Sequence, residues 1–456
     1  MDTHTFPPAP GPATLSLLGS WQQFRRDPLR MMSRWRGEYG DLMRFRLGLR
    51  PFFMLSHPAL AEEVLISRAD EFAKIAQTRK SSGFALVFGN GLVTSYGELW
   101  RRQRKLIQPV FHRGKVMAFG GRMVSCAQSL LARWDALAPG QPVLINQEMM
   151  RLTLEIITQT MFNRSVLEES ERLSAALDTV LRYATDTLRN PLMPPLFVPT
   201  PANRRFKQAL ALLDGVIERI IHERRESGER QEDFLDLLLE ARDESGAGMS
   251  DRQLRDEVLT VFVAGHETTA TALAWTWCLL AQHPEALARL RQELDEVLQG
   301  RPPTVADLPK LPWTRAVFDE ALRLYPPAPG VLRTPTRNVE LGGFNLPKGA
   351  IVFTNFYNIH RHPDFWPEAD AFRPERFLPD SPKPSHRLAY MPFSAGQRVC
   401  AGNHFALTEG PLLIALIAQA YDLRLPPETT VEPEMHATLK PKPGLVMTVY
   451  PRNRPA

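Results

Sequence analysis

A single cysteine in a glycine-flanked loop constrains this chain more than any other feature. The stretch FSAGQRVCAG spans residues 393–402 and precedes an apolar helical run. A thiolate persists only in positive surroundings, which Arg398 and the start of the following helix would supply around Cys400. Gly396 and Gly402 permit positive φ or a close approach of the backbone to a flat group, and Phe393 would shield the sulfur from water. The pattern predicts a thiolate that binds a metal ion.

The other two cysteines fit an ordinary structural role. Free cysteines are mostly inert and buried, and Cys126 and Cys278 lie in apolar helical surroundings. Three scattered cysteines form neither a disulfide framework nor a zinc site. An alternative for Cys400 is a cysteine hydrolase that pairs it with His404, but the flanking arginine and glycines fit a metal-bound thiolate better.

Composition and charge exclude several classes of protein. The chain has 456 residues, of which 44% are hydrophobic, but it has no apolar run long enough to cross a membrane. The N-terminus lacks a signal-peptide pattern. We therefore expect a soluble cytoplasmic protein without a membrane anchor. The net charge of +5 comes without an arginine stripe, which argues against nucleic acid and is compatible with an acidic protein partner.

The hydrophobic periodicity predicts a mainly α protein with small β-sheets (α+β), in one domain over residues 1–456. Helical periodicity dominates about 97–325, whereas proline-rich and strand-like pieces occupy about 40–56, 328–390 and the C-terminal tail. The predicted helices cover residues 13–36, 58–66, 98–108, 119–137, 146–162, 169–187, 203–227, 232–242, 251–281, 284–299, a stretch ending at 324, and 401–420. The predicted strands cover residues 42–47, 52–55, 350–354 and 446–449.

The predicted helix over 251–281 carries an unusual cluster, AGHETT, at residues 264–269. Glycine inside a helix costs about 1 kcal/mol relative to alanine, and Thr268 can bond the carbonyl of Ala264 and bend the helix. Close helix packing explains Ala264 and Gly265, but not an acid beside a hydroxyl. Glu267 and Thr268 are therefore predicted to relay protons, while His266 is interpreted as a structural or solvent-facing residue rather than a ligand.

Two sets of charged residues support the cysteine loop. Glu320 and Arg323, spaced i,i+3, can pair, and Arg376 offers a further partner; a surface salt bridge worth ~0–1 kcal/mol is the alternative. Trp100 and Arg104 lie one helical turn apart. The three arginines predicted to bind two carboxylates in bidentate fashion are Arg104, Arg333 and Arg398.

Taken in order, these motifs resemble those of the cytochrome P-450 family of haem-thiolate monooxygenases. The matching motifs are Trp100-x-x-x-Arg104, Ala264-Gly265-x-Glu267-Thr268-Thr269, Glu320-x-x-Arg323, Phe372-x-x-Glu375-Arg376-Phe377 and Phe393-x-x-Gly396-x-Arg398-x-Cys400-x-Gly402. The resemblance implies the P-450 fold, with haem b between the long Thr-bearing helix and the helix after the cysteine loop.

The resemblance also implies roles for these residues. Cys400 would ligate the haem iron, and Thr268 and Glu267 would deliver protons during dioxygen activation. The propionates would be held by Trp100, Arg104, Arg333 and Arg398, next to a cysteine loop shaped by Phe393, Gly396 and Gly402. The electrons would come from a separate ferredoxin or flavodoxin with its reductase. We expect this partner to dock on the basic face formed by Arg101, Arg102 and Lys105.

By family position, a hydrophobic substrate would be hydroxylated or epoxidised in an apolar pocket. A terpenoid, fatty-acyl, carotenoid or polyketide-like molecule fits such a pocket. The residues predicted to line it are Phe84, Leu86, Val87, Phe88, Val261, Phe262, Ala264, Val331, Leu332 and Leu439. Two alternatives remain open: a haem-thiolate isomerase or dehydratase, and a non-catalytic haem carrier or sensor. Glu267 and Thr268 argue against both.

Overall fold

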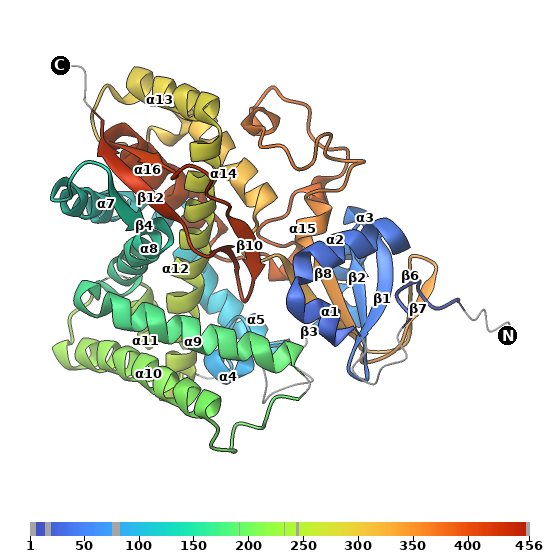
Figure 1. Ribbon diagram of the computed structural model, residues 1–456. Helices are drawn as coiled ribbons and strands as arrows, with labels where there is room; N and C mark the ends of the chain where they lie inside the picture. The colour runs from blue at the N-terminus through green and yellow to red at the C-terminus, as the bar shows by residue number, and fades with distance from the viewer. Residues whose placement is uncertain are drawn as a thin grey trace.

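The computed structural model describes residues 6–13, 20–74, 83–190, 192–231, 233–242 and 246–452. One long helix, α12 (Asp251–Gln282), runs through the middle of the molecule, and the other long helices surround it. A small sheet with its own helices packs on one side, where the described chain begins (Figure 1). The prediction of a mainly α protein with small β-sheets is confirmed.

The helix α12 is central because it is apolar on nearly all sides. Ser250 caps its N-terminus by accepting the amide proton of Gln253, and a helix that is hydrophobic all round is normally buried. The other helices of the main body are α4 (Ala85–Phe88), α5 (Gly97–Ile107), α6 (Arg113–Ala118), α7 (Gly120–Asp135), α8 (Ile145–Phe162), α9 (Ser170–Arg189), α10 (Pro201–Ser227), α11 (Phe234–Glu240), α13 (Pro284–Leu298), α14 (Pro312–Leu324) and α16 (Asn403–Ala420).

The largest sheet has five strands in the order β1-β2-β8-β5-β3. The predicted hairpin is present, with Leu42 opposite Leu55 and Leu47 opposite Arg50. The strands are β1 (Leu42–Leu47), β2 (Arg50–Leu55), β3 (Phe72–Lys74), β5 (Gly330–Pro335) and β8 (Ile351–Asn355), and the neighbouring helices are α1 (Trp21–Arg26), α2 (Pro28–Tyr39), α3 (Pro58–Glu62) and α15 (Phe356–Ile359). Part of the helix predicted over 13–36, residues 14–19, lies outside the described residues.

Smaller sheets bring distant segments together. The strand β12 (Val446–Pro451) pairs on one side with β4 (Gln141–Leu144) and on the other with β9 (Tyr421–Arg424). Two hairpins complete the set: β6 (Val339–Leu341) with β7 (Phe344–Leu346), and β10 (Glu432–Met435) with β11 (Leu439–Lys442). The β10–β11 hairpin crosses in front of α12 in Figure 1, so C-terminal residues reach the middle of the molecule.

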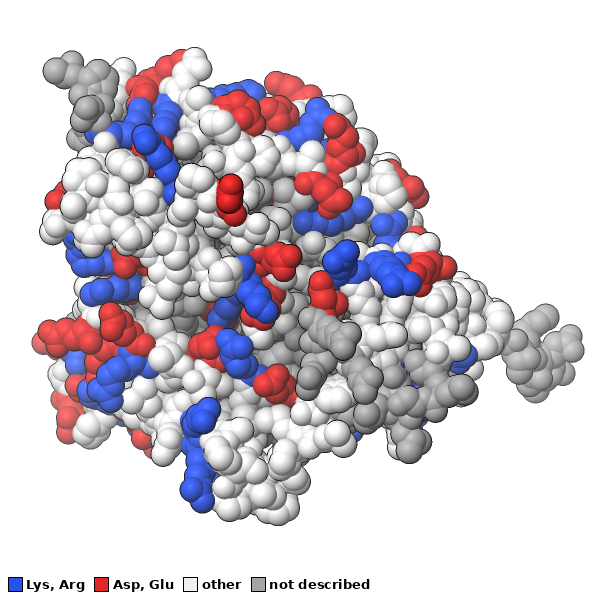
Figure 2. All heavy atoms as spheres, viewed as in Figure 1, with Lys and Arg blue, Asp and Glu red and all other residues white. Residues whose placement is uncertain are grey.

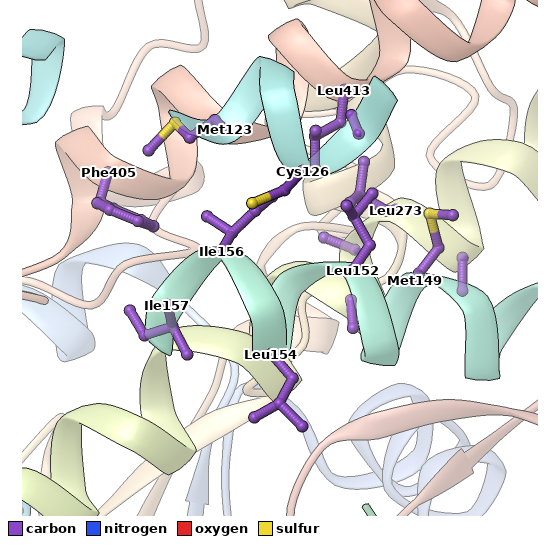
Figure 3. Close-up of a cluster of buried hydrophobic side chains, with 14 of the residues drawn as sticks. Met123, Cys126, Met149, Leu152, Leu154, Ile156, Ile157, Leu273, Phe405 and Leu413 are labelled. Carbon is purple, nitrogen blue, oxygen red and sulfur yellow. The ribbon is translucent and has the colours of Figure 1, made fainter. Parts of the chain in front are cut away.

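The core confirms two structural interpretations. A Cβ added to Gly265 would lie 2.5 Å from Cδ1 of Ile157 on α8, so close helix packing accounts for this glycine. Cys126 points into an apolar cluster with Met123 and Ile156 (Figure 3). Burial raises the pKa of both Cys126 and Cys278 to about 12, which keeps these thiols protonated and inert.

The described residues were compared with what a membrane span or a strongly charged surface would require. Within the described ranges, no helix is both long enough and apolar enough to cross a bilayer. On the face seen in Figure 2, basic and acidic side chains are interspersed. This mixing agrees with the small net charge of +5.

Candidate active site

A cavity of about 360 Å³, called here the Cys400 cavity, lies between α12 and the cysteine loop. One face of α12 lines it with Val261, Ala264, Thr268 and Ala272, and Cys400 lies among the residues that close the other side. The α12 residues are spaced three or four apart, so they share one helix face. Their small size leaves room for a bulky, flat group, as the sequence predicted.

The cysteine loop is shaped by backbone geometry that few residues tolerate. Gly396 has φ +71°, and a Cβ there would lie 2.0 Å from the carbonyl oxygen of Leu65, so only glycine fits. The amide of Cys400 donates to the carbonyl of Phe393 over 2.9 Å. Phe393, Cys400 and Gly402 all line the cavity. The loop therefore presents the exposed thiol of Cys400 to the cavity.

The surroundings of Cys400 act on its thiol in two directions. Desolvation by the surrounding protein raises its pKa, while the N–H of Gly402 and the positive charge of Arg104 lower it. Arg104 is held in place by a 3.0 Å bond from Nη1 to the carbonyl of Val399. A bound cation would shift this balance to the thiolate, because metal-bound thiols are deprotonated.

Four basic residues line the Cys400 cavity and an apolar cavity that adjoins it: Lys74, Arg104, Arg333 and Arg398. The guanidinium of Arg398 lies 4.0 Å from the ring centroid of Trp100 and donates to the carbonyl of Ser95 over 2.9 Å. Burial lowers the pKa of Arg398 to about 10, with smaller contributions from Arg333 and Arg104, and burial lowers that of Arg333 to about 10. No carboxylate in the described part of the chain forms an ion pair with these four, so they require an anionic partner of another kind.

Lys74 is the member of this set that sequence reasoning missed. It lies on β3, directly opposite Arg333 on β5. Burial lowers its pKa well below the usual value, and Arg333 and Arg398 add to that shift. An isolated lysine gives no signal in the sequence. Only the register of the two strands places it beside the arginines.

Thr268 has the predicted geometry. Its Oγ1 donates to the carbonyl of Ala264 over 2.9 Å, and its side chain lines the Cys400 cavity. The hydroxyl proton of Thr268 is used in this bond to the backbone carbonyl, but the hydroxyl oxygen can still accept a hydrogen bond. Its neighbour Thr269 lines the same cavity.

Glu267 is not brought to the Cys400 cavity, contrary to the expectation that it acts beside Thr268. Its Oε1 accepts from Thr438 over 2.9 Å and lies 3.1 Å from Nζ of Lys440, which also pairs with Asp178. Glu267 lines a separate polar cavity of about 580 Å³. The reason is helical geometry, since consecutive residues on a helix point roughly 100° apart. His266 is fully buried and its Nδ1 lies 2.6 Å from the carbonyl oxygen of Phe262, so it is structural and not solvent-facing.

The ion pair between Glu320 and Arg323 is confirmed, and the surface alternative is wrong because both side chains are fully buried. Two bonds of 2.6 and 2.8 Å join them, and Arg323 also donates to the carbonyls of His360, Ala369 and Ala371. Arg376 lies 3.5 Å from Glu320. His360 in turn accepts the amide proton of Met391 over 2.9 Å. The pair thus anchors the chain that leads into the cysteine loop.

Only part of the predicted substrate pocket lines a cavity. An apolar cavity of about 350 Å³, called here the sheet-side cavity, shares Lys74, Val93, Ala328 and Val331 with the Cys400 cavity. Among the ten predicted residues, those that line one of the two cavities are Phe84, Val261, Ala264, Val331 and Leu332. Those that line neither are Leu86, Val87, Phe88, Phe262 and Leu439.

Four of these five residues are buried in the protein core instead, and Leu86 is half-buried and packs against it. Phe262 contacts His266 edge-on, and the carbonyl of Leu439 accepts from Nε1 of Trp275 over 2.7 Å. Sequence reasoning also missed the residues that the β-sheet side contributes to the sheet-side cavity: Phe24, Phe45, Phe52, Phe353 and Met435. No local pattern marks them, because the cavity forms only where the sheet packs against the helices.

Comparison with known proteins agrees with this geometry. The sequence matches the Cytochrome P450 family over residues 8–449. The chain belongs to the cytochrome P450 family. Like other cytochromes P450, it takes haem as its cofactor, with a cysteine thiolate as ligand.

Individual relatives extend over nearly the whole chain. Cyclooctat-9-en-7-ol 5-monooxygenase of Streptomyces melanosporofaciens is 37% identical, over 92% of this chain and 90% of the relative. Pentalenene oxygenase of Streptomyces avermitilis is 34% identical, over 96% of both. The crystal structure of the cytochrome P450DA heme domain superposes with a TM-score of 0.89 and 28% identity, covering 99% of both chains. The protein is a P450 monooxygenase that acts on a hydrophobic substrate with electrons from a redox partner.

The residues of the Cys400 cavity fit haem. A cation cluster without an internal carboxylate partner matches the two propionates of the cofactor, which arginine can bind in bidentate fashion. The small-residue face of α12 and the exposed thiol of Cys400 line the same space, which leaves room for a flat ring. Cys126 and Cys278 are buried in the core, which leaves Cys400 as the cysteine that faces the cavity.

Proposed function

We propose that Cys400 is the thiolate ligand that would hold the haem iron and that the protein inserts one oxygen atom into a terpenoid substrate. The observation that carries the proposal is that Cys400 and Thr268 line one cavity beside a cluster of basic residues that form no ion pair within the described part of the chain. Bound haem supplies the redox chemistry that cleaves dioxygen, which a thiolate ligand favours. We also propose that residues 1–456 form one catalytic domain, as the family match over 8–449 supports.

In this proposal the side chains have distinct tasks. The propionates are held by Trp100, Arg104, Arg333 and Arg398, together with Lys74, while Phe393, Gly396 and Gly402 shape the loop around the sulfur. Thr268 holds a proton at Oγ1 inside the cavity. Glu267 collects protons from the polar cavity and must release Lys440 before it can turn toward Thr268. This exchange is compatible with an ion pair that is buried but borders a polar space.

The terpenoid assignment rests on two observations. The two relatives act on cyclooctat-9-en-7-ol and pentalenene by name, and aromatic and aliphatic side chains dominate the sheet-side cavity. Fatty-acyl, carotenoid and polyketide-like molecules remain alternatives of the same apolar class. An isomerase, a dehydratase or a haem carrier has less need for a cavity-facing hydroxyl such as that of Thr268.

The function can be tested with the purified holoenzyme and cyclic terpenoids. We expect such compounds to shift the haem spectrum on binding. In the presence of reductant and a redox partner, labelled dioxygen should place one labelled atom in the product. Tight binding of small charged compounds alone would contradict the substrate class, and product formation without dioxygen would favour an isomerase or dehydratase.

Replacing Thr268 with alanine is expected to separate oxygen consumption from product formation. The variant loses the cavity hydroxyl, so product per dioxygen consumed should fall by at least about tenfold, because general acid–base groups contribute about 10²–10⁴-fold to rates. Thr276→Ala is the matched control. Thr276 makes the same kind of bond, 2.8 Å to the carbonyl of Ala272, but is buried away from the cavity. If both variants form the same amount of product per dioxygen consumed, the proposed role of Thr268 is wrong.

A basic face on α5 is the proposed docking site for a ferredoxin or flavodoxin, in keeping with the cytoplasmic location expected from the sequence. Arg101, Arg102 and Lys105 are exposed, and α5 also carries Trp100 and Arg104 of the cavity. Charge complementarity mainly accelerates association.

Reversing two charges on this face, with Arg101→Glu and Lys105→Glu, should slow electron transfer by about tenfold at low salt. The difference should shrink as salt screens the charges. Arg30→Glu, an exposed position on α2, is the control. Stopped-flow reduction in the presence of carbon monoxide measures the rate, and an unchanged rate in the double variant would exclude this docking face.

A further inference from the structure

The loop between α4 and α5, residues 89–96, forms part of the wall of both cavities at the site. Leu92 and Val93 line the Cys400 cavity, and Val93 and Thr94 line the sheet-side cavity. A loop lacks the regular backbone bonds of a helix or a sheet, so other groups must hold its amides. The position of this α4–α5 loop therefore depends on the side chains around it.

Two adjacent acids on α12 accept amide protons from the α4–α5 loop. Oδ2 of Asp256 accepts from the amide of Asn90 over 2.8 Å. Oε2 of Glu257 accepts from the amide of Leu92 over 2.9 Å. Both acidic side chains are buried. The two bonds tie the loop to the helix that also carries Thr268.

The carboxylate of Glu257 is dedicated to this contact. Its side chain is fully buried and forms no ion pair within the described residues, whereas Asp256 pairs with Arg255 at 2.8 Å. The other oxygen of Glu257 accepts from Nε2 of Gln253, one turn earlier on α12, over 2.9 Å. Because a buried carboxylate needs partners for its oxygens, these two bonds fix its orientation, and the Leu92 amide is the loop group that it holds.

The α4–α5 loop lies directly against α12, so it cannot shift toward that helix. A Cβ added to Gly91 would lie 2.1 Å from Oγ1 of Thr260 and 2.6 Å from the carbonyl oxygen of Asp256. A residue without a side chain is required for this close approach. Loss of the bond to Glu257 would therefore move the wall away from α12 and loosen the cavity around Leu92.

Other side chains hold the α4–α5 loop near its two ends. Nε2 of Gln103 on α5 donates to the carbonyl of Asn90 over 2.8 Å. Arg398 of the cysteine loop donates to the carbonyl of Ser95 over 2.9 Å. The middle of the loop, which forms the cavity wall, is thus the part whose position depends on Glu257.

We propose that Glu257 is a positioning residue that sets substrate specificity, because it holds Leu92 and Val93 at the cavity wall. Glu257 itself lines neither cavity, so it acts through these two side chains. One apolar contact in a pocket contributes about 10–200-fold to discrimination between substrates. The wall therefore favours a large, rigid hydrophobic molecule that reaches it over a small one. The inference deepens the proposed function and rests on it.

Hydrogen exchange of the holoenzyme tests the clamp without turnover. Mass spectrometry of peptides that cover residues 89–96 gives the exchange rate. Glu257→Leu removes the acceptor of the Leu92 amide and should speed exchange in this loop by about tenfold, as expected for one lost hydrogen bond. Glu257→Gln keeps an acceptor oxygen and should restore the exchange rate of the wild type. Wild-type exchange in Glu257→Leu would overturn the proposal.

Two haem ligands of different size test the wall itself. Imidazole and 4-phenylimidazole both bind haem iron through a nitrogen, but only the second carries a ring large enough to reach a pocket wall. In Glu257→Leu the dissociation constant of 4-phenylimidazole should rise by about tenfold, while that of imidazole should stay within about twofold of the wild type. Glu257→Gln should bind both ligands as the wild type does. The shift of the haem spectrum measures both constants.

Leu92→Ala tests the same wall with the acid intact. It should also weaken 4-phenylimidazole by about tenfold and leave imidazole nearly unchanged. The double variant with Glu257→Leu should be no worse than the weaker-binding single variant, because both changes remove one contact. An unchanged ratio of the two dissociation constants in Leu92→Ala would refute the proposal even if Glu257→Leu fails to fold.

Glu155→Leu is the matched control. Glu155 is buried on α8 and likewise accepts from a loop amide, that of Val166, over 3.1 Å and from a glutamine one turn away, Gln159. Val166 lines neither cavity. This control should speed exchange near Val166 and leave the ratio of the two dissociation constants unchanged. An equal change of that ratio in Glu155→Leu and Glu257→Leu would mean that Glu257 has no specific role at the wall.

Failure of this inference can be told apart from failure of the proposed function. Loss of cysteine ligation in the wild-type carbon monoxide spectrum would refute the proposed function and leave the exchange result for Glu257→Leu standing. Normal cysteine ligation together with an unchanged ligand ratio in Glu257→Leu would refute the positioning role alone.

Discussion

Replacing Cys400 with serine is expected to abolish the strongly red-shifted Soret band of the reduced, carbon monoxide-bound protein. That band reports a thiolate bonded to haem iron, and serine offers no thiolate. The loss should be complete, because the other two cysteines are buried in the core and burial raises their pKa to about 12. The measurement is the difference spectrum of the reduced protein with and without carbon monoxide.

The controls for this experiment are Cys126→Ser and Cys278→Ser. Both should retain the red-shifted band, although each puts a hydroxyl into apolar surroundings and will lower stability. Haem content should be measured in all three variants, so that loss of the band is separated from loss of the cofactor. A band that persists in Cys400→Ser, or iron held by nitrogen in the wild type, would contradict the assignment.

Replacing Arg323 with methionine is expected to destabilise the protein by about 3–5 kcal/mol, the usual effect of removing one partner from a buried ion pair. The substitution leaves Glu320 uncompensated in a site where both side chains are fully buried. It also removes the donor for the carbonyls of His360, Ala369 and Ala371. The free energy of unfolding from urea titration gives the size of the effect, and haem content should fall with it.

A double variant separates the ion pair from the backbone anchoring. Glu320→Leu combined with Arg323→Met removes both charges, so part of the stability should return. The recovery should be incomplete, because the three carbonyls still lack their donor and the amide of Arg373 loses its acceptor. Arg230→Met, from an exposed pair with Glu240, should change stability by only about 0–1 kcal/mol. Equal effects of Arg323→Met and Arg230→Met would mean that the buried pair does not anchor the loop.

Most of the helical fold could be predicted from local pattern. The periodicity predicted helices over 203–227 and 284–299, and the structure has α10 at Pro201–Ser227 and α13 at Pro284–Leu298. Long amphipathic segments give such a signal because one face must be buried at every turn. The hairpin around Gly48 was equally readable. By contrast, β3 and β4 are three or four residues long, and strands of that length carry too little pattern.

In the candidate site too, features carried by neighbouring residues could be predicted and features that join distant segments could not. The residues of the cysteine loop are neighbours in sequence, so their spacing alone indicated a thiolate, and Thr268 made its predicted bond to Ala264. The direction in which the Glu267 side chain points from α12 could not be predicted from its sequence neighbours. Its ion-pair partner Lys440 is far away in sequence. The side of α12 on which the Glu267 side chain lies is decided by the segments that pack against that helix.

The sequence by itself determined the family, the thiolate loop and the Glu320–Arg323 pairing, because each depends on residues at short fixed spacings along a helix or turn. Tertiary structure alone decided that Lys74 joins the arginines and that Glu267 turns to Lys440. In each of these cases the contact joins segments far apart in the chain. The energy of burying a charge there depends on the whole surrounding core, which no local stretch of sequence encodes.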